Sequence, residues 1–498
     1  MTKVIIIGAG VSGLSAGCFL QMNGYETEIF EKHDKAGGLC ASWKRKGYHI
    51  DGCVHWWYCT SINDPIYPTL DALLDMKNFP RVIYEEFCSI EEDDKILRFF
   101  SNLDLFETEL KTISPEDSKT IEEMIDGARK IASTYMHSDS NKEFYKWKVS
   151  IGEYLKKIKS SLIKKLLTTF PFSPESSIYE FLLLSARLHN KDACYPIGGA
   201  QKLVDRLVQR YTSFGGTINY NSNVTQILTK NDSVKGIQLN NGKKYNADYI
   251  ISAADGYSTI RNMLKGQYVD ENIRKLYYNN RYFPQDSQIY VSLGINKVFK
   301  DSFKPYVFIT LKNPLIIEEE NVNTVGITIH NFDPTSAPFG KTVLTILIPI
   351  KYTESWINLR KKNKTEYERK KEEIARHMIE EIDSYFGNIK TKVEMVDVAT
   401  PATYLRYTNN WNGGAPMSWG TDISWGTDGT LIVNKPKKEI TGLNNFFMCG
   451  QWVGDVGLSE GMQSGKDVAK FLCEQEGKNF QIITYKNKPN NKFSTAIT

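Results

Sequence analysis

The sequence predicts an α/β protein whose nucleotide-binding sheet is assembled from separated segments of the chain. The first observation is a run of aliphatic residues, Val4–Ile7, that leads directly into a glycine-rich turn, Gly8–Gly13. The second is the return of strand, glycine-rich turn and helix over residues 444–475. The third is a middle block, residues 195–255, in which a helix alternates with short strands. Three α/β pieces so far apart favour one discontinuous sheet with other structure inserted between them.

The first turn has the GxGxxG pattern. Gly8 permits the tight turn, Gly10 lets a pyrophosphate approach the backbone, and Gly13 lets the following helix pack on the strand. A second strand, Glu26–Phe30, ends at Glu31, whose carboxylate can accept hydrogen bonds from a ribose hydroxyl. The unit predicts a Rossmann-like dinucleotide-binding domain. The motif by itself does not choose between NAD and FAD.

Composition narrows the class of protein. A chain of 498 residues exceeds the usual size of one core, so we expect two domains, and a net charge of +4 gives no reason to expect a nucleic-acid partner. The eight cysteines contain no CxxC pair, which favours reduced thiols over disulfides or a metal site. We expect neither a signal peptide nor a spanning helix, and therefore a cytoplasmic protein that stays in solution or rests on a membrane surface.

The composition and periodicity of the sequence change along the chain. We expect helices over 102–133, 141–167, 200–213 and 363–386, and a buried strand over Tyr249–Ser252. These changes predict a nucleotide-binding domain of residues 1–60, 190–265 and 430–478, a substrate-binding α+β domain of residues 61–189 and 266–429, and a polar tail of residues 485–498.

Further motifs carry a resemblance to a known family. Paired glycines occur at Gly37–Gly38, a GYHIDG run spans 47–52, CGQW spans 449–452, and Gly457 opens a helix that contains Met462. Together they resemble the two-dinucleotide-binding-domain flavoproteins of the amine oxidase-like superfamily. Within it they are most similar to the group of phytoene desaturases, carotenoid isomerases and retinol saturases.

The resemblance implies FAD as the cofactor. It places the pyrophosphate at the first turn, the adenosine ribose at Glu31 and Lys32, and the isoalloxazine O2 at the start of the last helix, whose dipole would stabilise reduced flavin. The FAD-binding residues that it implies are Gly8, Gly10, Ser12, Gly13, Glu31, Lys32, Gly38, Leu39, Val224, Gly450, Gly457, Leu458 and Met462.

Two departures from the superfamily pattern stand out. Leu39 and Cys40 occupy the place where amine oxidases usually carry an arginine, which disfavours an amine substrate. Residues 454–457 replace the Pro-Gly-Gly-Gly run that usually follows Gly-Gln-Trp in the carotenoid and retinol group.

Aromatic residues are the best indication of the substrate. His55, Trp56 and Trp57 follow the 47–52 run, and Tyr407 and Trp419 flank a second glycine pair. We expect these five side chains to line an apolar channel at the flavin, although each could also be part of an ordinary core. His55 could donate a proton or be structural. The sequence identifies no catalytic residue and shows no metal-binding pattern.

Residues 154–167 predict a basic amphipathic helix. Leu155, Ile158, Leu162 and Leu166 would share one face, with lysines elsewhere around it. Such a helix either lies in an anionic membrane interface or packs its apolar face on the core.

The predicted function is a FAD-dependent oxidoreductase that acts on carbon–carbon bonds of a long apolar isoprenoid or lipid-like molecule. Desaturation, saturation and cis–trans isomerisation remain open. One alternative is a flavin amine oxidase. Another, from a different class, is a non-enzymatic carrier of prenylated proteins similar to GDP-dissociation inhibitors. The oligomeric state is not predicted.

Overall fold

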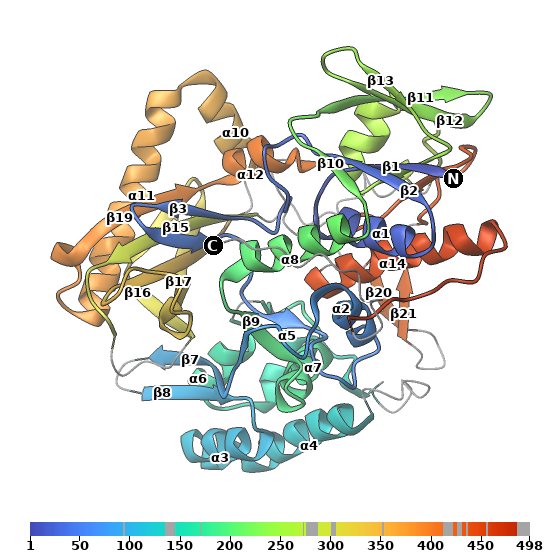
Figure 1. The fold of residues 1–498 in the computed structure, drawn as a ribbon. Helices are drawn as coiled ribbons and strands as arrows, with labels where there is room; N and C mark the ends of the chain where they lie inside the picture. Colours follow the sequence, from blue (N-terminus) through green and yellow to red (C-terminus); the bar gives the residue numbers. More distant parts are fainter. Residues whose placement is uncertain are drawn as a thin grey trace.

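A computed structural model provides the structure of the chain (Figure 1). It describes residues 1–92, 95–134, 144, 146–169, 171–271, 273–274, 287–299, 305–350, 353–411, 422–425, 431–434, 437–454 and 457–485.

A five-stranded parallel sheet forms the nucleotide-binding part of the fold. Its strands, in spatial order, are β10 (Thr217–Asn219), β2 (Glu26–Phe30), β1 (Lys3–Ile7), β14 (Tyr249–Ser252) and β22 (Phe446–Met448). All four neighbouring pairs run parallel, so residues from three distant parts of the chain share one sheet. The predicted α/β fold with a Rossmann-like sheet of discontinuous strands is confirmed.

Helices α1 (Val11–Met22), α8 (Gly199–Ser213) and α14 (Leu458–Gln475) lie beside this sheet (Figure 1). Two glycines allow the close packing. A Cβ atom on Gly13 would lie 2.1 Å from Gly8 O, and one on Gly465 would lie 2.4 Å from Ser12 O. Neither position accepts a side chain, so the first and last helices of the described chain meet backbone to backbone.

A seven-stranded mixed sheet forms the second part of the fold. Its strands, in spatial order, are β19 (Val393–Ala399), β15 (Ser287–Ile295), β18 (Thr342–Ile350), β17 (Glu320–Ile329), β16 (Tyr306–Ile317), β7 (Glu86–Glu92) and β8 (Lys95–Phe100). Most neighbours are antiparallel, but β16 and β7 are parallel. Helices α10 (Thr353–Lys362) and α11 (Lys364–Phe386) lie on the same side of the molecule as this sheet, at the left of Figure 1.

The remaining helices lie mostly between residues 61 and 190. They are α2 (Tyr67–Leu74), α3 (Leu103–Ile113), η1 (Pro115–Asp117), α4 (Ser118–Thr134), α7 (Ile178–His189), η4 (Ser258–Met263), η6 (His330–Phe332), η7 (Lys390–Lys392) and α12 (Pro401–Thr408).

Smaller sheets complete the fold. They are β11 (Val224–Lys230) with β12 (Ser233–Leu239) and β13 (Lys244–Asn246), β3 (Ser42–Arg45) with β4 (Tyr48–Asp51), β5 (Trp57–Tyr58) with β9 (Ala193–Pro196) and β6 (Arg81–Ile83), and β20 (Asp422–Trp425) with β21 (Leu431–Asn434).

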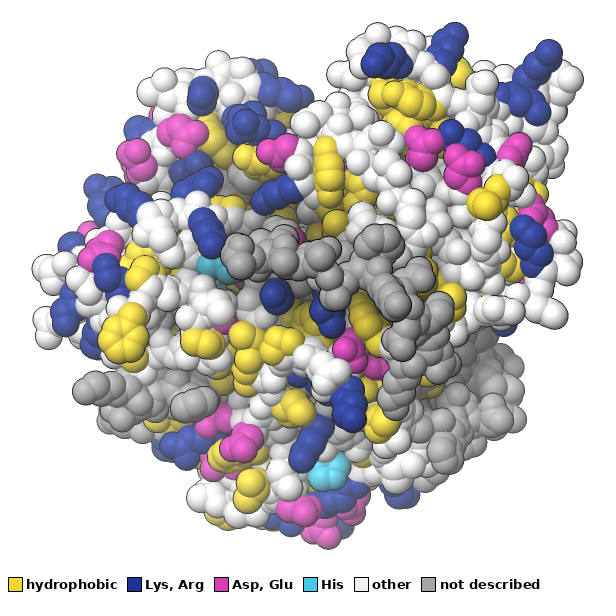
Figure 2. All heavy atoms as spheres, in the orientation of Figure 1, with side chains coloured by type: hydrophobic (Ala, Val, Ile, Leu, Met, Phe, Trp, Pro, Cys, Tyr) yellow, Lys and Arg dark blue, Asp and Glu magenta, His cyan; other side chains and the backbone are white. Residues whose placement is uncertain are grey.

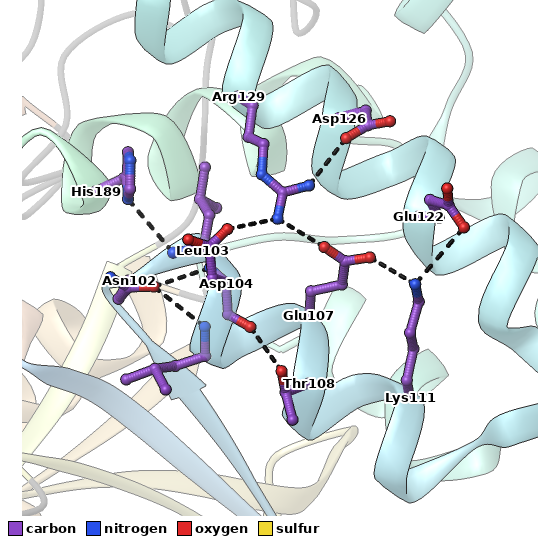
Figure 3. Close-up of polar contacts among 11 residues, drawn as sticks. Asn102, Leu103, Asp104, Glu107, Thr108, Lys111, Glu122, Asp126, Arg129 and His189 are labelled. Carbon is purple, nitrogen blue, oxygen red and sulfur yellow. Dashed lines mark hydrogen bonds and ion pairs between the residues drawn. The ribbon is translucent and has the colours of Figure 1, made fainter.

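Helices α3 and α4 pack their apolar faces together and join their polar faces by ion pairs (Figure 3). Arg129 of α4 contacts Asp104 and Glu107 of α3, each at 2.6 Å, and Lys111 of α3 contacts Glu122 of α4 at 3.6 Å. Because these groups are partly exposed, the pairs fix orientation more than they add to the free energy of unfolding. The predicted helical region over 102–133 is confirmed as these two helices.

The predicted basic helix over residues 154–167 is wrong as a single helix. The chain forms α5 (Ile151–Tyr154), a 3-10 turn η3 (Leu155–Lys157) and then α6 (Ser161–Leu167). Asp117 interrupts the helix, because its carboxylate accepts hydrogen bonds of 2.9–3.0 Å from the two backbone N–H groups just before α6. A distant carboxylate therefore overrides a local helical pattern.

The apolar side chains of this segment are in the core. Ile158, Leu162 and Leu166 are only 2–3% exposed. The amphipathic pattern was therefore a core-packing pattern, and the membrane contact predicted for residues 154–167 has no free apolar face to use.

Three further sequence predictions concern the whole chain. All eight cysteines are free thiols. No helix in the described parts of the chain is both long and apolar enough to cross a bilayer. The predicted tail lies outside the described residues except for Tyr485, whose hydroxyl donates to Leu73 O at 3.2 Å. The domain boundaries remain a prediction.

Candidate functional site

The glycine turn leaves its backbone accessible at the start of α1. Gly10 is the N-cap residue of this helix, and no side chain caps it. A Cβ atom on Gly10 would lie 4.0 Å from Gly37 O and meet no closer atom of the described chain. The first turn of α1 therefore directs its N–H groups towards open space, which suits a diphosphate.

The paired glycines complete this turn. The Gly37 N–H donates to Ala9 O at 2.9 Å, and a backbone bridge joins Gly37 to Gly10. Gly37 and Gly38 both have positive φ angles, of 134° and 61°. A Cβ atom on Gly37 would lie 2.6 Å from Cys40 O, so glycine is required there to bring Gly38 and Leu39 beside the first turn.

Glu31 stands at the end of β2, as predicted. Its carboxylate is 6% exposed and accepts hydrogen bonds from the N–H groups of Ala9, at 2.8 Å, and His33, at 3.0 Å. A carboxylate offers about four acceptor positions, so capacity remains for a ribose hydroxyl. Val224 begins β11 nearby, since the Ser222 N–H donates to Glu31 O at 2.7 Å.

Lys32 points towards the end of α12. Its Nζ donates to Asn409 Oδ1 at 2.8 Å, and burial lowers the pKa of this lysine. His33 Nε2 is hydrogen-bonded to the carbonyl of Tyr407. The helix α12 of the predicted substrate domain thus touches the predicted adenosine end of the site.

The last segment of the sheet meets the same turn. Gly450 has a φ of 98°, a Cβ atom on it would lie 3.1 Å from Ser12 Oγ, and its N–H donates to Ser464 Oγ at 3.0 Å. Gly457, with a φ of 138°, is the N-cap residue of α14, so Leu458 opens this helix. Met462 is fully buried, and its carbonyl accepts a 2.6 Å hydrogen bond from Ser15 Oγ.

These observations fit a bound dinucleotide. The three predicted glycine segments, far apart in sequence, converge on one open turn, and an acid stands where a ribose is expected. The resemblance included Met462 among the FAD-binding residues, and in the structure this side chain is part of the buried core.

Asp51 fixes the chain that leaves this region. Its carboxylate accepts hydrogen bonds from the N–H groups of Cys53 and Val54, at 2.9 and 3.1 Å. It also accepts from the Ala200 N–H at 2.9 Å and the Tyr195 hydroxyl at 3.0 Å. Burial raises the pKa of Asp51, and the four hydrogen bonds lower it in part. One buried carboxylate therefore ties the 47–52 run to the start of α8.

His55 lies directly after this tie. Its Nε2 is hydrogen-bonded to the Tyr290 hydroxyl and its Nδ1 to the Tyr306 hydroxyl. The Tyr84 hydroxyl donates to His55 O at 2.9 Å. Burial lowers the pKa of His55 to about 4, so the ring is neutral near pH 7. The imidazole is thus held between two phenols. These phenols belong to β15 and β16 of the seven-stranded sheet.

The surroundings of His55 are aromatic. Trp56 lies 6.0 Å from the His55 ring, 5.2 Å from Phe87 and 5.9 Å from Tyr306, measured between ring centroids. His55 and Trp56 each keep part of their surface accessible. An apolar surface with a few hydroxyl groups therefore faces the space beside them.

A second histidine, His330, stands nearby. Its Nε2 lies 3.2 Å from Thr345 Oγ1, and burial lowers its pKa to about 4 as well. Phe332, two residues on, packs against Tyr195 at 4.9 Å and Tyr84 at 6.2 Å between ring centroids. His330 and Phe332 thus join the group around His55 through the tyrosines.

Trp57 has different surroundings from Trp56, which precedes β5 and stays partly accessible. Trp57 is 1% exposed, and its indole N–H donates to Ser459 Oγ at 2.8 Å. Ser459 lies in the first turn of α14, so Trp57 braces the helix that is predicted to face the flavin. Its surroundings are those of a core residue.

Of the two remaining predicted substrate residues, the described structure places only Tyr407, and it lies apart from this group. Tyr407 is 47% exposed and lies with His33, 5.6 Å between ring centroids, at the predicted adenosine end. Trp419 lies outside the described residues.

Tyr84, Tyr195, Tyr290, Tyr306 and His330 were not found from the sequence. They come from β9, β15, β16, η6 and the segment after β6, and Tyr306, for example, is 251 positions from His55 along the chain. The one indication in the sequence was that the segments after residue 265 that are typical of strands are rich in aromatic residues. This pattern does not show which of those residues face inward.

A known protein family matches most of the chain. A family model described as flavin containing amine oxidoreductase matches residues 11–472. A 4,4'-diapophytoene desaturase of Methylomonas sp is 21% identical, over 97% of this chain and 97% of the relative. Prolycopene isomerase 1 of an Oncidium hybrid cultivar is 22% identical, over 81% and 73% of the two chains. All-trans-retinol 13,14-reductase of Danio rerio is 20% identical, over 81% and 75%.

Solved structures share the fold. An oxidoreductase from Methanosarcina mazei aligns with a TM-score of 0.66 at 15% identity, over 94% of this chain and all of the other. A putrescine oxidase variant aligns with a TM-score of 0.61 at 14% identity, over 95% and 99%. Rab GDI from Plasmodium falciparum aligns with a TM-score of 0.51 at 11% identity, over 96% and 99%. The family match confirms FAD as the predicted cofactor.

Proposed function

Because this chain belongs to the flavin-containing amine oxidoreductase family, we propose that it uses FAD to change carbon–carbon bonds of a long apolar molecule of the isoprenoid or lipid class. The three relatives are named for desaturation, isomerisation and reduction of such molecules. At 20–22% identity they support the substrate class and leave the direction of the reaction open.

The observation that carries this proposal is the group around His55. Its contacts are phenol hydroxyls and aromatic rings, and Asp51, the nearby carboxylate, already accepts four hydrogen bonds. A cationic amine would gain most from a free carboxylate or an open aromatic cage. An apolar chain gains instead from contact with Trp56 and the neighbouring rings.

FAD, when bound, accepts or supplies the hydride. The chain's own residues would hold the cofactor at the glycine turn and Glu31, orient the substrate along the aromatic rings and keep water away.

We assign the accompanying proton to the His55 group. A neutral imidazole has one N–H donor and one acceptor nitrogen. With a phenol on each nitrogen, one tyrosine donates to the ring and the other accepts from it, so the accepting phenol can donate its own hydrogen to a further acceptor. The three groups can therefore pass a proton in either direction. The alternative is that His55 only holds Tyr290 and Tyr306 in place.

The test is a comparison of substrates under one assay. The purified protein with FAD should absorb at about 450 nm, and should convert a long isoprenoid with a change in double-bond number or geometry. Chromatography of the products separates desaturation, saturation and isomerisation. Gly10→Val is the matched control, because its side chain would fill the open space beside Gly37 and exclude FAD.

Two outcomes would contradict the proposal. Hydrogen peroxide release with amines, and no change in isoprenoids, would favour an amine oxidase. A colourless protein that takes up no FAD but binds prenylated peptides would favour a carrier of the GDP-dissociation-inhibitor kind. The family match and the intact glycine turn speak against that second outcome.

A further inference from the structure

The most exposed aromatic side chain in the described structure is at a loop tip. Phe339 has 105% of the accessible surface of a reference phenylalanine. It lies between Pro338 and Gly340 in the loop 333–341 that joins η6 to β18. Other described phenylalanines, such as Phe308 and Phe332, are buried or half-buried. A fully exposed ring costs free energy in water that it regains only when something covers it.

Basic residues lie on the hairpin turn next to this loop. The loop rests on the turn of the β3–β4 hairpin, since a Cβ atom on Gly47 would lie 3.4 Å from Pro338 Cγ. The hairpin carries Lys44, Arg45 and Lys46, all exposed, and the loop ends at Lys341. Figure 2 shows basic and acidic side chains interspersed over the face that it displays.

Acidic partners neutralise only part of this charge. Arg45 pairs with Asp397 at 3.1 Å, and Lys341 pairs with Glu394 at 2.5 Å. Lys46 Nζ donates to the Glu394 carbonyl, which carries no charge. The four basic groups therefore meet two carboxylates, which leaves an excess of positive charge on the hairpin turn and the neighbouring loop that carries Phe339.

The base of the same loop reaches the group around His55. Asp333 is 2% exposed and accepts a 2.9 Å hydrogen bond from the Gly198 N–H, at the start of α8. Ser336 O accepts from the His49 N–H at 2.8 Å, on β4. One residue before Asp333, Phe332 packs on Tyr84, whose hydroxyl donates to His55 O. Loop 333–341 therefore connects the exposed Phe339 to the group around His55.

We propose that the tip of loop 333–341 and the β3–β4 turn rest on an anionic membrane surface, with Phe339 inserted among the lipid headgroups. This placement rests on the proposed function, because it would let an apolar substrate pass from the bilayer towards Phe332 and His55 without crossing water. Phe339 gains by leaving water, and Lys44, Arg45 and Lys46 gain by approaching lipid phosphates.

A hairpin of the seven-stranded sheet, β16–β17, provides a matched control. Ile316 is 74% exposed near the turn between β16 and β17. Its turn carries Glu318, Glu319 and Glu320, so an anionic surface would repel it. An exposed apolar residue is thus present at both sites, and only the charge around it differs.

The experiment is sedimentation of the full-length protein with vesicles of equal parts phosphatidylglycerol and phosphatidylcholine. We expect wild-type protein to sediment with them and Phe339→Ser to bind at least about tenfold more weakly. Phe339→Trp should restore binding, because tryptophan favours the membrane interface. Ile316→Ser should bind like wild type.

Charge is tested separately. Lys44→Glu combined with Lys46→Asn should weaken binding at least about tenfold and make it insensitive to salt, at roughly 1 kcal/mol for each basic group. Asparagine suits residue 46, which has a φ of 49°. Pure phosphatidylcholine vesicles should bind wild type weakly. Circular dichroism checks that each variant folds.

Three results would overturn this proposal. They are wild-type protein that ignores anionic vesicles, equal binding by Phe339→Ser, and a concentration-dependent dimer that Phe339→Ser abolishes. The last would show that a second copy covers Phe339. Vesicle binding needs no turnover, so its failure is distinct from failure of the proposed reaction, which is measured with substrate in detergent micelles.

Discussion

The two faces of the seven-stranded sheet are made from alternate residues of the same strands, yet they differ completely in chemistry. The outer face is aliphatic and packs against α10 and α11. Its core members are Ile289, Val291, Leu293, Ile295, Val307, Ile309, Val325, Ile327, Leu344, Ile346 and Ile348. The inner face, towards His55, carries mainly aromatic, hydroxyl and small residues, together with Val343 and Leu347. Burial alone cannot explain this, because both faces are buried.

A row of hydroxyl groups crosses the inner face. Tyr306 is opposite Thr328, Thr328 is opposite Thr345, and Thr345 is opposite Ser292 in the strand register. These four side chains are 1–5% exposed. A face that served stability alone would be expected to resemble the outer one, since buried hydroxyls cost free energy unless they are hydrogen-bonded. The outer face therefore has the composition of an ordinary core, and the inner face has the hydroxyl and aromatic groups on which the proposed function depends.

The largest expected effect is on the inner face at His55. His55→Phe keeps a ring of similar size but removes both nitrogens that meet Tyr290 and Tyr306. If the imidazole passes the proton, turnover should fall about 100-fold or more. Flavin content, measured by absorbance, should not change. A fall in turnover of less than about fivefold would leave His55 with only a structural role.

The outer face should show the reverse. Ile346→Ala removes a fully buried side chain that lies opposite Val291 and Ile327 in the register. We expect a loss of about 3 kcal/mol in the free energy of unfolding, measured by urea denaturation, with unchanged turnover per folded molecule. A variant that stays stable but loses turnover would show that the outer face also serves the reaction.

The sequence could predict the nucleotide-binding part because its signals are local. A strand, a glycine turn, a helix and a terminal acid follow one another between Lys3 and Glu31. The requirement for glycine at Gly13 and Gly37 is a backbone contact that any chain with this turn must satisfy. These features depend on consecutive residues. Because strand, glycine-rich turn and helix return near the end of the chain, the sequence also predicted the discontinuous sheet.

The inner face could not be predicted for the opposite reason. Which side of β15 or β16 faces His55 depends on register, and a shift of one residue would turn Tyr290 outward and Ile289 inward. The break before α6 depends on Asp117, more than forty positions away. The sequence predicted Trp57 as a substrate residue because it follows the 47–52 run, and it could not show the contact of Trp57 with Ser459, more than 400 positions away. Long-range geometry decides these points.

A smaller expected effect is the pH dependence of the free energy of unfolding that comes from His330, which contacts Thr345 of the inner face. The pKa of His330 falls from 6.5 to about 4 on folding because burial disfavours its charged form, and His49 acts in the same direction. Below pH 6.5 the unfolded chain gains a proton that the folded chain refuses, so stability falls as the pH falls towards 4. From pH 7 to pH 5 we expect a loss of about 2 kcal/mol from this group.

The measurement compares urea denaturation of wild type and His330→Gln at both pH values. Glutamine can still hydrogen-bond to Thr345 but does not titrate, so the variant should lose about 2 kcal/mol less than wild type. Asp333 raises the pKa of His330 and works against the shift. As a control, Ile346→Ala should lose as much free energy of unfolding between pH 7 and pH 5 as wild type does. An equal loss in wild type and His330→Gln would rule out a neutral buried imidazole.

The smallest expected effect concerns Ser292, which makes the sharpest distinction between stability and function. Ser292 is 1% exposed, and its hydroxyl has no hydrogen-bond partner among the described residues. A buried hydroxyl without a partner lowers stability, so Ser292→Ala should raise the free energy of unfolding by about 1 kcal/mol. The neighbouring Val291→Ala, on the outer face, should lower it by a similar amount or more. If the inner face is kept for the substrate, the stabilised Ser292→Ala protein should also bind substrate a few times more weakly, seen as a raised KM with little change in kcat. A Ser292→Ala protein that is less stable than wild type, with an unchanged KM, would mean that the hydroxyl has a structural partner and that the contrast between the two faces does not extend to this position.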